Sequence, residues 1–298
     1  MRNSFKVNIG LFCAVFLWAS AFVGIRVGLT DYSPGALALF RFLVASLCMG
    51  LIYHSMSMQK KIPWLDRIPL IVVGAIGIGA YNLCLNYGEQ TVSAGVASFI
   101  LGLMPMLTVL LSVIFLKERP APCLYIGSVV SFTGLLLLLF STDKATAVDY
   151  GVLIIVFAAI ISALYNLLQK RYFRGHHPIA VTAWIIWGGT LSLMFFAPTL
   201  WQEIHVASIS ATMAATYLGI FPAALAYMAW SYVLNEIPAS KASLYMYAMP
   251  VISTMLGFFI LHEQPSLQSL CGSLLALAGG LYATGYWPRF SMAKKLLF

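Results

Sequence analysis

The sequence predicts an all-α membrane protein in which ten transmembrane helices form two inverted-topology repeats of five helices each. Three observations support this prediction: an apolar composition, ten long apolar runs, and an internal repeat. Hydrophobic residues make up 61% of the 298-residue chain and charged residues only 9%, whereas soluble domains contain roughly 45–50% and 25%. A chain this apolar is expected to lie in a lipid bilayer.

Ten apolar runs are long enough to cross a bilayer, because a spanning helix needs about 20 residues. The connections are short and leave no room for a soluble domain. The first run follows Arg2 and Lys6 and imitates a signal peptide, but it is long for one and further spans follow, so we expect it to be the first membrane helix. The expected spans are about 8–27, 35–54, 68–87, 92–116, 122–141, 149–170, 178–200, 211–234, 239–261 and 267–287.

The internal repeat relates the first half of the chain to the second. The phrases "GLMPMLTVLLSVIFLKERPA" and "YAMPVISTMLGFFILHEQPS" align when the chain is shifted by 145 positions. This shift superimposes Pro105 on Pro250 and Glu118 on Glu263. A repeat of almost half the chain indicates one structural unit that occurs twice.

The two repeats are expected at 8–141 and 149–287, and each holds five spans, so the second enters the membrane in the opposite sense. Lys and Arg accumulate on the cytoplasmic side. With both termini cytoplasmic, fourteen of these residues lie inside, Arg26 and Lys144 lie outside, and Arg41 lies within a span. The net charge of +8 is therefore a topology signal, and no nucleic-acid partner is expected. Inverted repeats are common in secondary transporters, whose substrate site lies between the repeats.

Four phrases together carry a resemblance to a known family. They are "FLWASAFVGIR", "SPGALALFRFLVA" and the two copies of the repeated phrase. The chain resembles, over about residues 8–287, the EamA branch of the drug/metabolite transporter superfamily, which consists of ten-helix bacterial permeases. The resemblance implies export or exchange of amino acids and related small metabolites across the inner membrane. It also implies a cavity lined by helices 1, 3, 4, 6, 8 and 9, with helices 5 and 10 at the periphery.

The two repeats do not match at every position that a site would use. Ile160 and Ile185 stand at about the places of Trp18 and Arg41 in the second half. A site that uses Trp18 and Arg41 is therefore expected to be asymmetric.

Pro105 and Pro250 are expected near the centres of the fourth and ninth spans. A proline there removes a backbone hydrogen bond, and a carbonyl freed in lipid must find a partner or face a cavity. We interpret the two prolines as hinges beside the substrate or, alternatively, as packing kinks. Glu118 and Glu263 close the repeated phrase on opposite faces of the membrane and are candidate gate residues.

Polar side chains recur at helical spacing along four of the spans, which places them on one face of each helix. Aromatic residues are enriched in the same spans, and an aromatic cavity suits apolar side chains or a cation. Interhelical hydrogen bonding and interfacial belts are the alternative roles. The candidate substrate-binding residues are Trp18, Tyr81, Asn82, Asn86, Ser98, Tyr165, Asn166, Tyr227, Ser243 and Tyr247.

Arg41 is the one charged residue well inside an expected span, which makes it a functional hypothesis by default. We favour a structural role, by snorkelling or by pairing with Asp31 or Glu89. Recognition of a substrate carboxylate and gating of the outer side are the alternatives. No acidic residue is expected at mid-membrane, so a facilitator or exchanger is favoured over coupling through a buried acid.

The motifs of enzymes and metalloproteins are missing from the sequence. The five cysteines are scattered singly, so we expect neither disulfides nor a zinc site. His176 and His177 are adjacent and project differently on a helix, without a third ligand nearby. No nucleotide-binding or hydrolase motif is present. We therefore expect no enzyme activity, no metal and no cofactor.

Small residues recur in the last span at Gly272, Ala276 and Gly280. Such a run allows close helix packing, which we expect within a monomer, with a dimer as the alternative. The resulting prediction is an inner-membrane secondary transporter of amino acids or related metabolites that works by alternating access. An exporter of organic cations or drugs is the alternative substrate class, and a channel and an intramembrane enzyme are the rivals from other classes.

Overall fold

The computed structural model describes residues 2–57, 62–102, 104–115, 117, 122–139, 150–173, 175–262 and 267–283. Every regular element in this part of the chain is helical, which confirms the predicted all-α class. Helical elements occupy all ten segments that the sequence predicts to be apolar spans. Among the described residues, seven helices are long and apolar enough to cross a membrane.

The first half of the chain begins with two long helices, followed by shorter helical pieces. Pro34 is the first residue of α2 and follows an extended Ser33, because proline is favoured where its missing N–H would have no helical partner. The elements are α1 (Arg2–Gly28), α2 (Pro34–Ser55), α3 (Trp64–Gly74), η2 (Ala75–Ala80), α4 (Tyr81–Gly88), α5 (Ala94–Leu101), α6 (Met104–Phe115) and α7 (Pro122–Leu139).

The second half repeats this arrangement. Pro178 starts α9 after an extended His177, as Pro34 starts α2. The elements are α8 (Tyr150–Phe173), α9 (Pro178–Leu193), η3 (Met194–Phe196), α10 (Ala197–Glu203), α11 (Ile209–Leu218), η4 (Gly219–Leu225), α12 (Ala226–Glu236), α13 (Ala239–Ser243), η5 (Leu244–Ala248), α14 (Met249–Leu261) and α15 (Leu267–Ala283).

Two spans are interrupted by π-helical turns at equivalent positions. In the first half η2 joins α3 to α4, and in the second η4 joins α11 to α12. A shift of 145 positions places Ala75, the first residue of η2, on Ile220 within η4. Pro222 lies inside η4, where the wider turn accommodates a residue without a backbone N–H. Isolated π turns are frequent at functional sites.

The sequence led us to expect Pro105 and Pro250 in the middle of continuous helices, but the structure places both prolines near helix starts. Each is the second residue of a new helix, α6 or α14. The preceding helix α5 ends at Leu101, and α14 is preceded by the 3₁₀ segment η5. Because the first-turn N–H groups of a helix are unpaired in any case, a proline there costs no hydrogen bond. The fourth and ninth spans are therefore interrupted in the turn that precedes each proline, where the prolines were expected to free backbone carbonyls.

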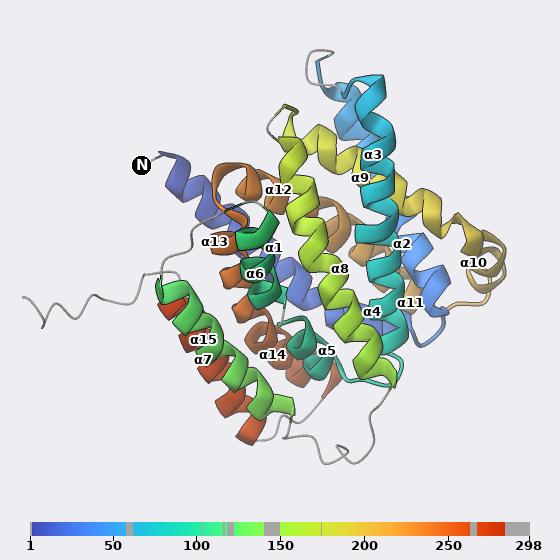
Figure 1. The fold of residues 1–298 in the computed structure, drawn as a ribbon. Helices are drawn as coiled ribbons and strands as arrows, with labels where there is room; N and C mark the ends of the chain where they lie inside the picture. Colours follow the sequence, from blue (N-terminus) through green and yellow to red (C-terminus); the bar gives the residue numbers. More distant parts are fainter. Residues whose placement is uncertain are drawn as a thin grey trace, which may run out of the picture.

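The helices pack around α1, which lies against α11, α12 and α14 of the second half. The helices α7 and α15 lie side by side at one edge of the molecule (Figure 1) and pack mainly on each other. This contact is close because Gly127 of α7 has no side chain: a Cβ there would lie 2.6 Å from the backbone nitrogen of Ala283 in α15. Of the predicted run of small residues, Gly280 lies against the side chain of Tyr247 in η5.

Near both ends of α2, side-chain hydrogen bonds join loops and helix ends of the first half to those of the second half. Just before the first residue of α2, the Glu203 carboxylate accepts hydrogen bonds from the backbone and the hydroxyl of Ser33, at 2.9 and 3.2 Å. Nearby, Asp31 accepts from the backbone N–H of Ser208 at 2.8 Å, and the hydrogen bonds from Ser208 lower the pKa of this carboxyl. Beyond the other end of α2, the His176 ring lies 3.1 Å from the Asp66 carboxylate.

Candidate functional site

A small cavity lies between the two halves of the chain. Its lining comes from α1, α2, α4, α5 and α6 of the first half and from α8, α12, η5 and α14 of the second. Its volume is about 40 Å³, and a single water needs at least about 10–15 Å³ on this measure. The cavity therefore has room for a few water molecules, and an amino acid would require the helices to move apart.

Most of the predicted binding residues meet in this cavity. The six that line it are Trp18, Tyr81, Asn82, Tyr165, Asn166 and Tyr227. Arg41 of α2 lines it as well. The polar and aromatic residues therefore lie on the faces of α1, α4, α8 and α12 that line this cavity.

Four other predicted residues do not line the cavity, because neighbouring groups engage or cover them. The amide of Asn86 donates to the Pro34 carbonyl at 2.9 Å. Ser98 accepts a 2.6 Å hydrogen bond from Ser253 of α14. The Ser243 hydroxyl donates within its own helix, to Ser240. Tyr247 is 1% exposed and packs against Gly280 of α15.

An aromatic cluster forms one wall of the cavity, with Tyr227 at its centre. The Tyr227 ring makes edge contacts with Trp18 at 5.3 Å and with Tyr165 at 6.2 Å between ring centroids. Trp18 also makes an edge contact with Trp230, at 5.3 Å. These rings come from α1, α8 and α12, so the cluster joins the two halves of the chain.

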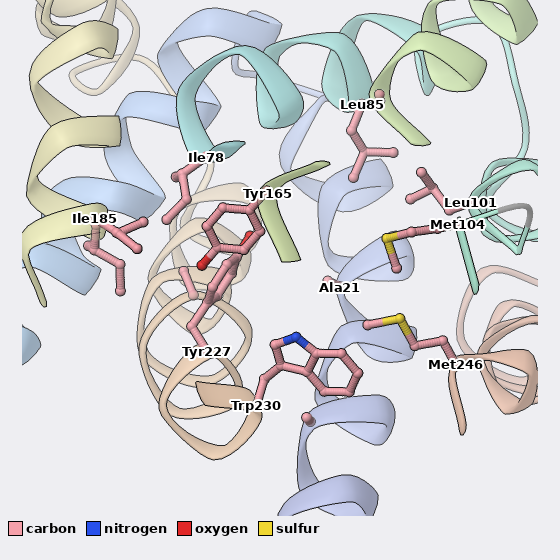
Figure 2. Packing of buried hydrophobic residues seen from close by; sticks show 14 of the residues in the cluster. Ala21, Ile78, Leu85, Leu101, Met104, Tyr165, Ile185, Tyr227, Trp230 and Met246 are labelled. Carbon is pink, nitrogen blue, oxygen red and sulfur yellow. The ribbon is translucent and has the colours of Figure 1, made fainter. Parts of the chain in front are cut away.

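Two hydrogen bonds fix the polar groups of this wall. The indole N–H of Trp230 donates to the Asn166 side-chain oxygen at 2.9 Å, and both residues are buried. The Tyr165 hydroxyl donates to the side-chain oxygen of Gln169 at 2.5 Å. Figure 2 shows Tyr165, Tyr227 and Trp230 on one side, with the thioether of Met104 on the other. The wall is thus pre-organised and carries few polar groups that lack a partner.

The repeat register places equivalent residues of the two halves in the same cavity. Leu101 and Met246 are 145 positions apart, as are Met104 and Met249, and all four line it. The sequence analysis did not select them, because apolar residues in apolar helices carry no polar signal. The repeat register alone would have found them, since each lies within one turn of Pro105 or Pro250.

Asn82 and Tyr227 are a third equivalent pair, again 145 positions apart, and both line the cavity. Each lies within two residues of the end of a π turn, η2 or η4. The irregular segments of both repeats therefore position the cavity residues.

Arg41 is 3% exposed, and its Nε and Nη1 atoms make no hydrogen bond within the described residues. Its Cζ atom lies 5.2 Å from the centroid of the Phe42 ring. The groups that interact with it electrostatically are Tyr227, Tyr81 and Glu89. Asp31, one of the two expected partners, instead bonds to the backbone of Ser208.

Glu89 is fully buried and follows the last residue of α4. No acidic residue was expected at mid-membrane, and Glu89, at the end of the third span, was expected only as one of two partners for Arg41. The Glu89 backbone carbonyl accepts a 2.9 Å hydrogen bond from Arg26. Arg26 therefore fixes the backbone beside this buried carboxylate.

The candidate gate residues Glu118 and Glu263 lie outside the described residues. Within the described part of the chain, no group of three or more His, Cys, Asp or Glu side chains is arranged to hold a metal ion. His176 instead bonds to Asp66 and to the backbone of Tyr172.

Comparison with known proteins identifies relatives over almost the whole chain. The model of the EamA-like transporter family matches residues 5–140 and again residues 149–284. An uncharacterized transporter of Bacillus subtilis, YdfC, is 37% identical over 93% of this chain and 90% of its own length. A probable terminal-alkyne amino-acid exporter of Streptantibioticus cattleyicolor is 30% identical, with 92% of each chain covered.

One solved crystal structure shares the fold. Its TM-score is 0.76 at 22% sequence identity, and the superposition covers 97% of this chain and 99% of that one.

Proposed function

The chain belongs to the EamA-like transporter family, and from this premise we propose that it moves amino acids or related small metabolites across the inner membrane by alternating access. It is a multi-pass membrane transporter and not an enzyme. Its partners are accordingly a small-molecule substrate and the lipid bilayer. The direction that we propose is export or exchange.

The proposed topology has ten spans in two inverted repeats, 8–141 and 149–287, with both termini cytoplasmic. The distribution of Lys and Arg supports this orientation. The π turns and the helix breaks recur at a spacing of 145 residues, which supports two copies of one unit. A monomer is proposed because the closest glycine contact of α15 is made with α7 of the same chain.

The observation that carries the proposal is a cavity lined by equivalent residues of both repeats. In inverted-repeat transporters the substrate site lies between the repeats, and interrupted helices form it. Here the cavity is bounded by Leu101 and Met246, at the helix breaks, and by Asn82 and Tyr227, beside the π turns. Movement of one repeat against the other would open such a site first to one side of the membrane and then to the other.

The helix breaks at Pro105 and Pro250 are the proposed hinges of this movement. Both are short, both precede a first-turn proline, and both contribute lining residues. Glu118 and Glu263, at the ends of the same spans, remain the proposed gate residues.

Amino acids are the proposed substrate class, supported by the similarity to a probable amino-acid exporter. The cavity combines apolar and aromatic walls with a few polar groups, as small-molecule sites commonly do. Organic cations are the second candidate class, because Trp18 and Tyr227 present aromatic faces.

Counterflow in proteoliposomes tests the proposal. Vesicles are loaded with unlabelled threonine, methionine or a quaternary ammonium ion, and uptake of the labelled compound is followed. Saturable accumulation of an amino acid is the expected result. Accumulation of the cation alone would select the second candidate class, and absence of counterflow for all three would contradict the proposed substrates.

Two variants connect this assay to the cavity. Asn82→Ala, in the cavity, should reduce counterflow at unchanged expression, whereas the exposed Asn235→Ala should not. Equal rates for the two variants would place the substrate elsewhere.

A further inference from the structure

Arg41 is the one charged side chain among the described residues that line the cavity. We propose that Arg41 binds the carboxylate of the transported molecule. The substrates of this site are then small monocarboxylates with an apolar side chain, of which amino acids are one class. The inference rests on the proposed function because it concerns the same cavity, but it assigns the residue and the chemical group that recognition depends on.

The first argument is the state of the Arg41 guanidinium. The residue is 3% exposed, and its buried Nε and Nη1 atoms make no hydrogen bond within the described residues. Unsatisfied buried donors are unfavourable, and more so when they carry charge. A planar guanidinium presents paired N–H groups that match the two oxygens of a carboxylate. Because Nε and Nη1 lie on different edges of the guanidinium, one bound carboxylate would satisfy one of these two donors together with Nη2.

The second argument is the chemistry of the remaining lining. Tyr81 and Tyr227, which interact electrostatically with Arg41, carry hydroxyl groups that can also bind a carboxylate. The apolar part of the cavity is contributed by both repeats. It includes Leu101, Met104, Met246 and Met249. Carboxylate recognition and an apolar pocket are thus present in one cavity.

The third argument concerns the substrate ammonium. Within the described lining no carboxylate is available to pair with it. The Asn166 side-chain oxygen already accepts from Trp230. An ammonium group is left with neutral partners, namely the Asn82 and Ser162 side chains and the ring faces of Trp18 and Tyr227, which bind it more weakly than a carboxylate would. The carboxylate is therefore the required group and the ammonium a dispensable one, and an organic cation would meet the like charge of Arg41.

Ligand-dependent thermal stabilisation of the purified full chain in detergent tests this order of importance. The probes are methionine, its deaminated acid 4-(methylthio)butanoate, its amide methioninamide, and the decarboxylated amine. We expect the deaminated acid to bind within about fivefold of methionine, since the cost of desolvating the ammonium offsets most of what its neutral partners contribute. The amide and the amine should bind about ten- to a hundredfold more weakly. Equal affinity of acid and amide, or no binding of any carboxylate, would overturn the inference.

Variants test whether Arg41 is the residue that produces the preference for the acid over the amide. Arg41→Gln should abolish the preference for the acid over the amide, and Arg41→Lys should retain part of it. Arg171→Gln removes the same charge from an exposed position on α8 and should leave the preference intact. If Arg41→Gln does not fold, the affinities of the four probes for the unaltered chain still show whether the carboxylate is the required group. A preference that survives in Arg41→Gln would exclude Arg41 as the recognition residue.

Counterflow separates this inference from the proposed function. A carboxylate preference that depends on Arg41, found without counterflow, would contradict the proposed transport and support the binding site. Counterflow of amino acids with equal competition by acid and amide would support transport and contradict the role of Arg41.

Discussion

The indole N–H of Trp18 donates a 3.1 Å hydrogen bond to the backbone carbonyl of Pro222. Trp18 belongs to α1 of the first repeat, and Pro222 lies in the π turn η4 of the second. A backbone carbonyl at membrane depth needs a partner, and here the cavity wall supplies it. The irregular turn and the aromatic cluster are therefore parts of one arrangement.

Trp18→Phe should destabilise the protein by about 1 kcal/mol, because the ring contacts are largely kept while the donor to Pro222 is lost. The measurement is reversible unfolding in mixed micelles. Trp201→Phe is the control, since Trp201 is 70% exposed on α10 and should change stability by less than about 0.5 kcal/mol. An equal loss in the two variants would mean that the hydrogen bond contributes nothing.

Asn166→Ala should destabilise the protein by about 1–3 kcal/mol. The substitution leaves the indole N–H of Trp230 buried without an acceptor, and such a group costs its full desolvation. Asn235→Ala is the matched control, because Asn235 is exposed on α12 of the same span as Trp230. Chemical denaturation of both variants checks the difference, and a loss for Asn166→Ala no greater than that of the control would contradict it.

The length of the apolar runs predicted where the main helical segments lie, because each run must be long enough to cross a bilayer. Two features of the fold could not be predicted from the apolar runs. The π turn η2 has the sequence AIGIGA, and its two glycines do not distinguish it from an ordinary membrane helix, in which glycine is frequent. The starts of α6 and α14 beside Pro105 and Pro250 were not predicted either, because both prolines were treated as interior residues, whereas both lie in first turns.

Only some of the candidate residues line the cavity, because the sequence does not show how each helix is rotated relative to its neighbours. Spacing shows which residues share a face of one helix, but it does not show what that face touches. Tyr81 and Asn82 face the cavity, whereas Asn86 on the same short helix binds the start of α2. Tyr247 and Met246 are neighbours on η5, yet only Met246 lines the cavity. Contacts between helices determine which of two neighbouring residues faces the cavity.

Ser98 and Ser253 should be energetically coupled by about 0.6 kcal/mol, the average for hydrogen bonds between membrane helices. Their hydroxyls are 2.6 Å apart and buried, and they join α5 to α14 across the repeats. A double-mutant cycle with Ser98→Ala and Ser253→Ala measures the coupling. A second cycle that pairs Ser98→Ala with Ser112→Ala should be additive, since Ser112 bonds within its own helix. Additivity in both cycles would remove the proposed link.

Gly127→Ala should destabilise the protein by about 1–3 kcal/mol through overpacking, because the added methyl group would meet the backbone of α15. Gly50→Ala introduces the same change in α2, where a Cβ would meet nothing within 4 Å. It should be neutral or stabilise the helix by up to about 1 kcal/mol. Thermal unfolding of the two variants checks the contrast, and counterflow should survive in both because neither glycine lines the cavity. Identical unfolding temperatures would show that α7 and α15 do not pack as closely as described.

Pro250→Ala should slow counterflow while leaving substrate affinity close to that of the unaltered protein. Proline keeps the 3₁₀ segment η5 separate from α14, and alanine would allow one continuous helix through Met249. A straighter helix disfavours movement at the break, and substitutions in moving elements typically change such equilibria by about 0.5–2 kcal/mol, which is roughly a 2- to 30-fold change in rate.

Two further variants separate a hinge from a packing role at this position. Pro250→Gly also removes the ring but keeps the segment flexible, so it should retain more transport than Pro250→Ala. Pro198→Ala is the matched control, because Pro198 is the second residue of α10 and is exposed at the edge of the molecule. If Pro250→Gly and Pro250→Ala lose the same transport and the same stability, the ring serves packing alone. Faster transport by the glycine variant at equal affinity would identify the break as a moving part, and the equivalent substitutions at Pro105 should then show the same order.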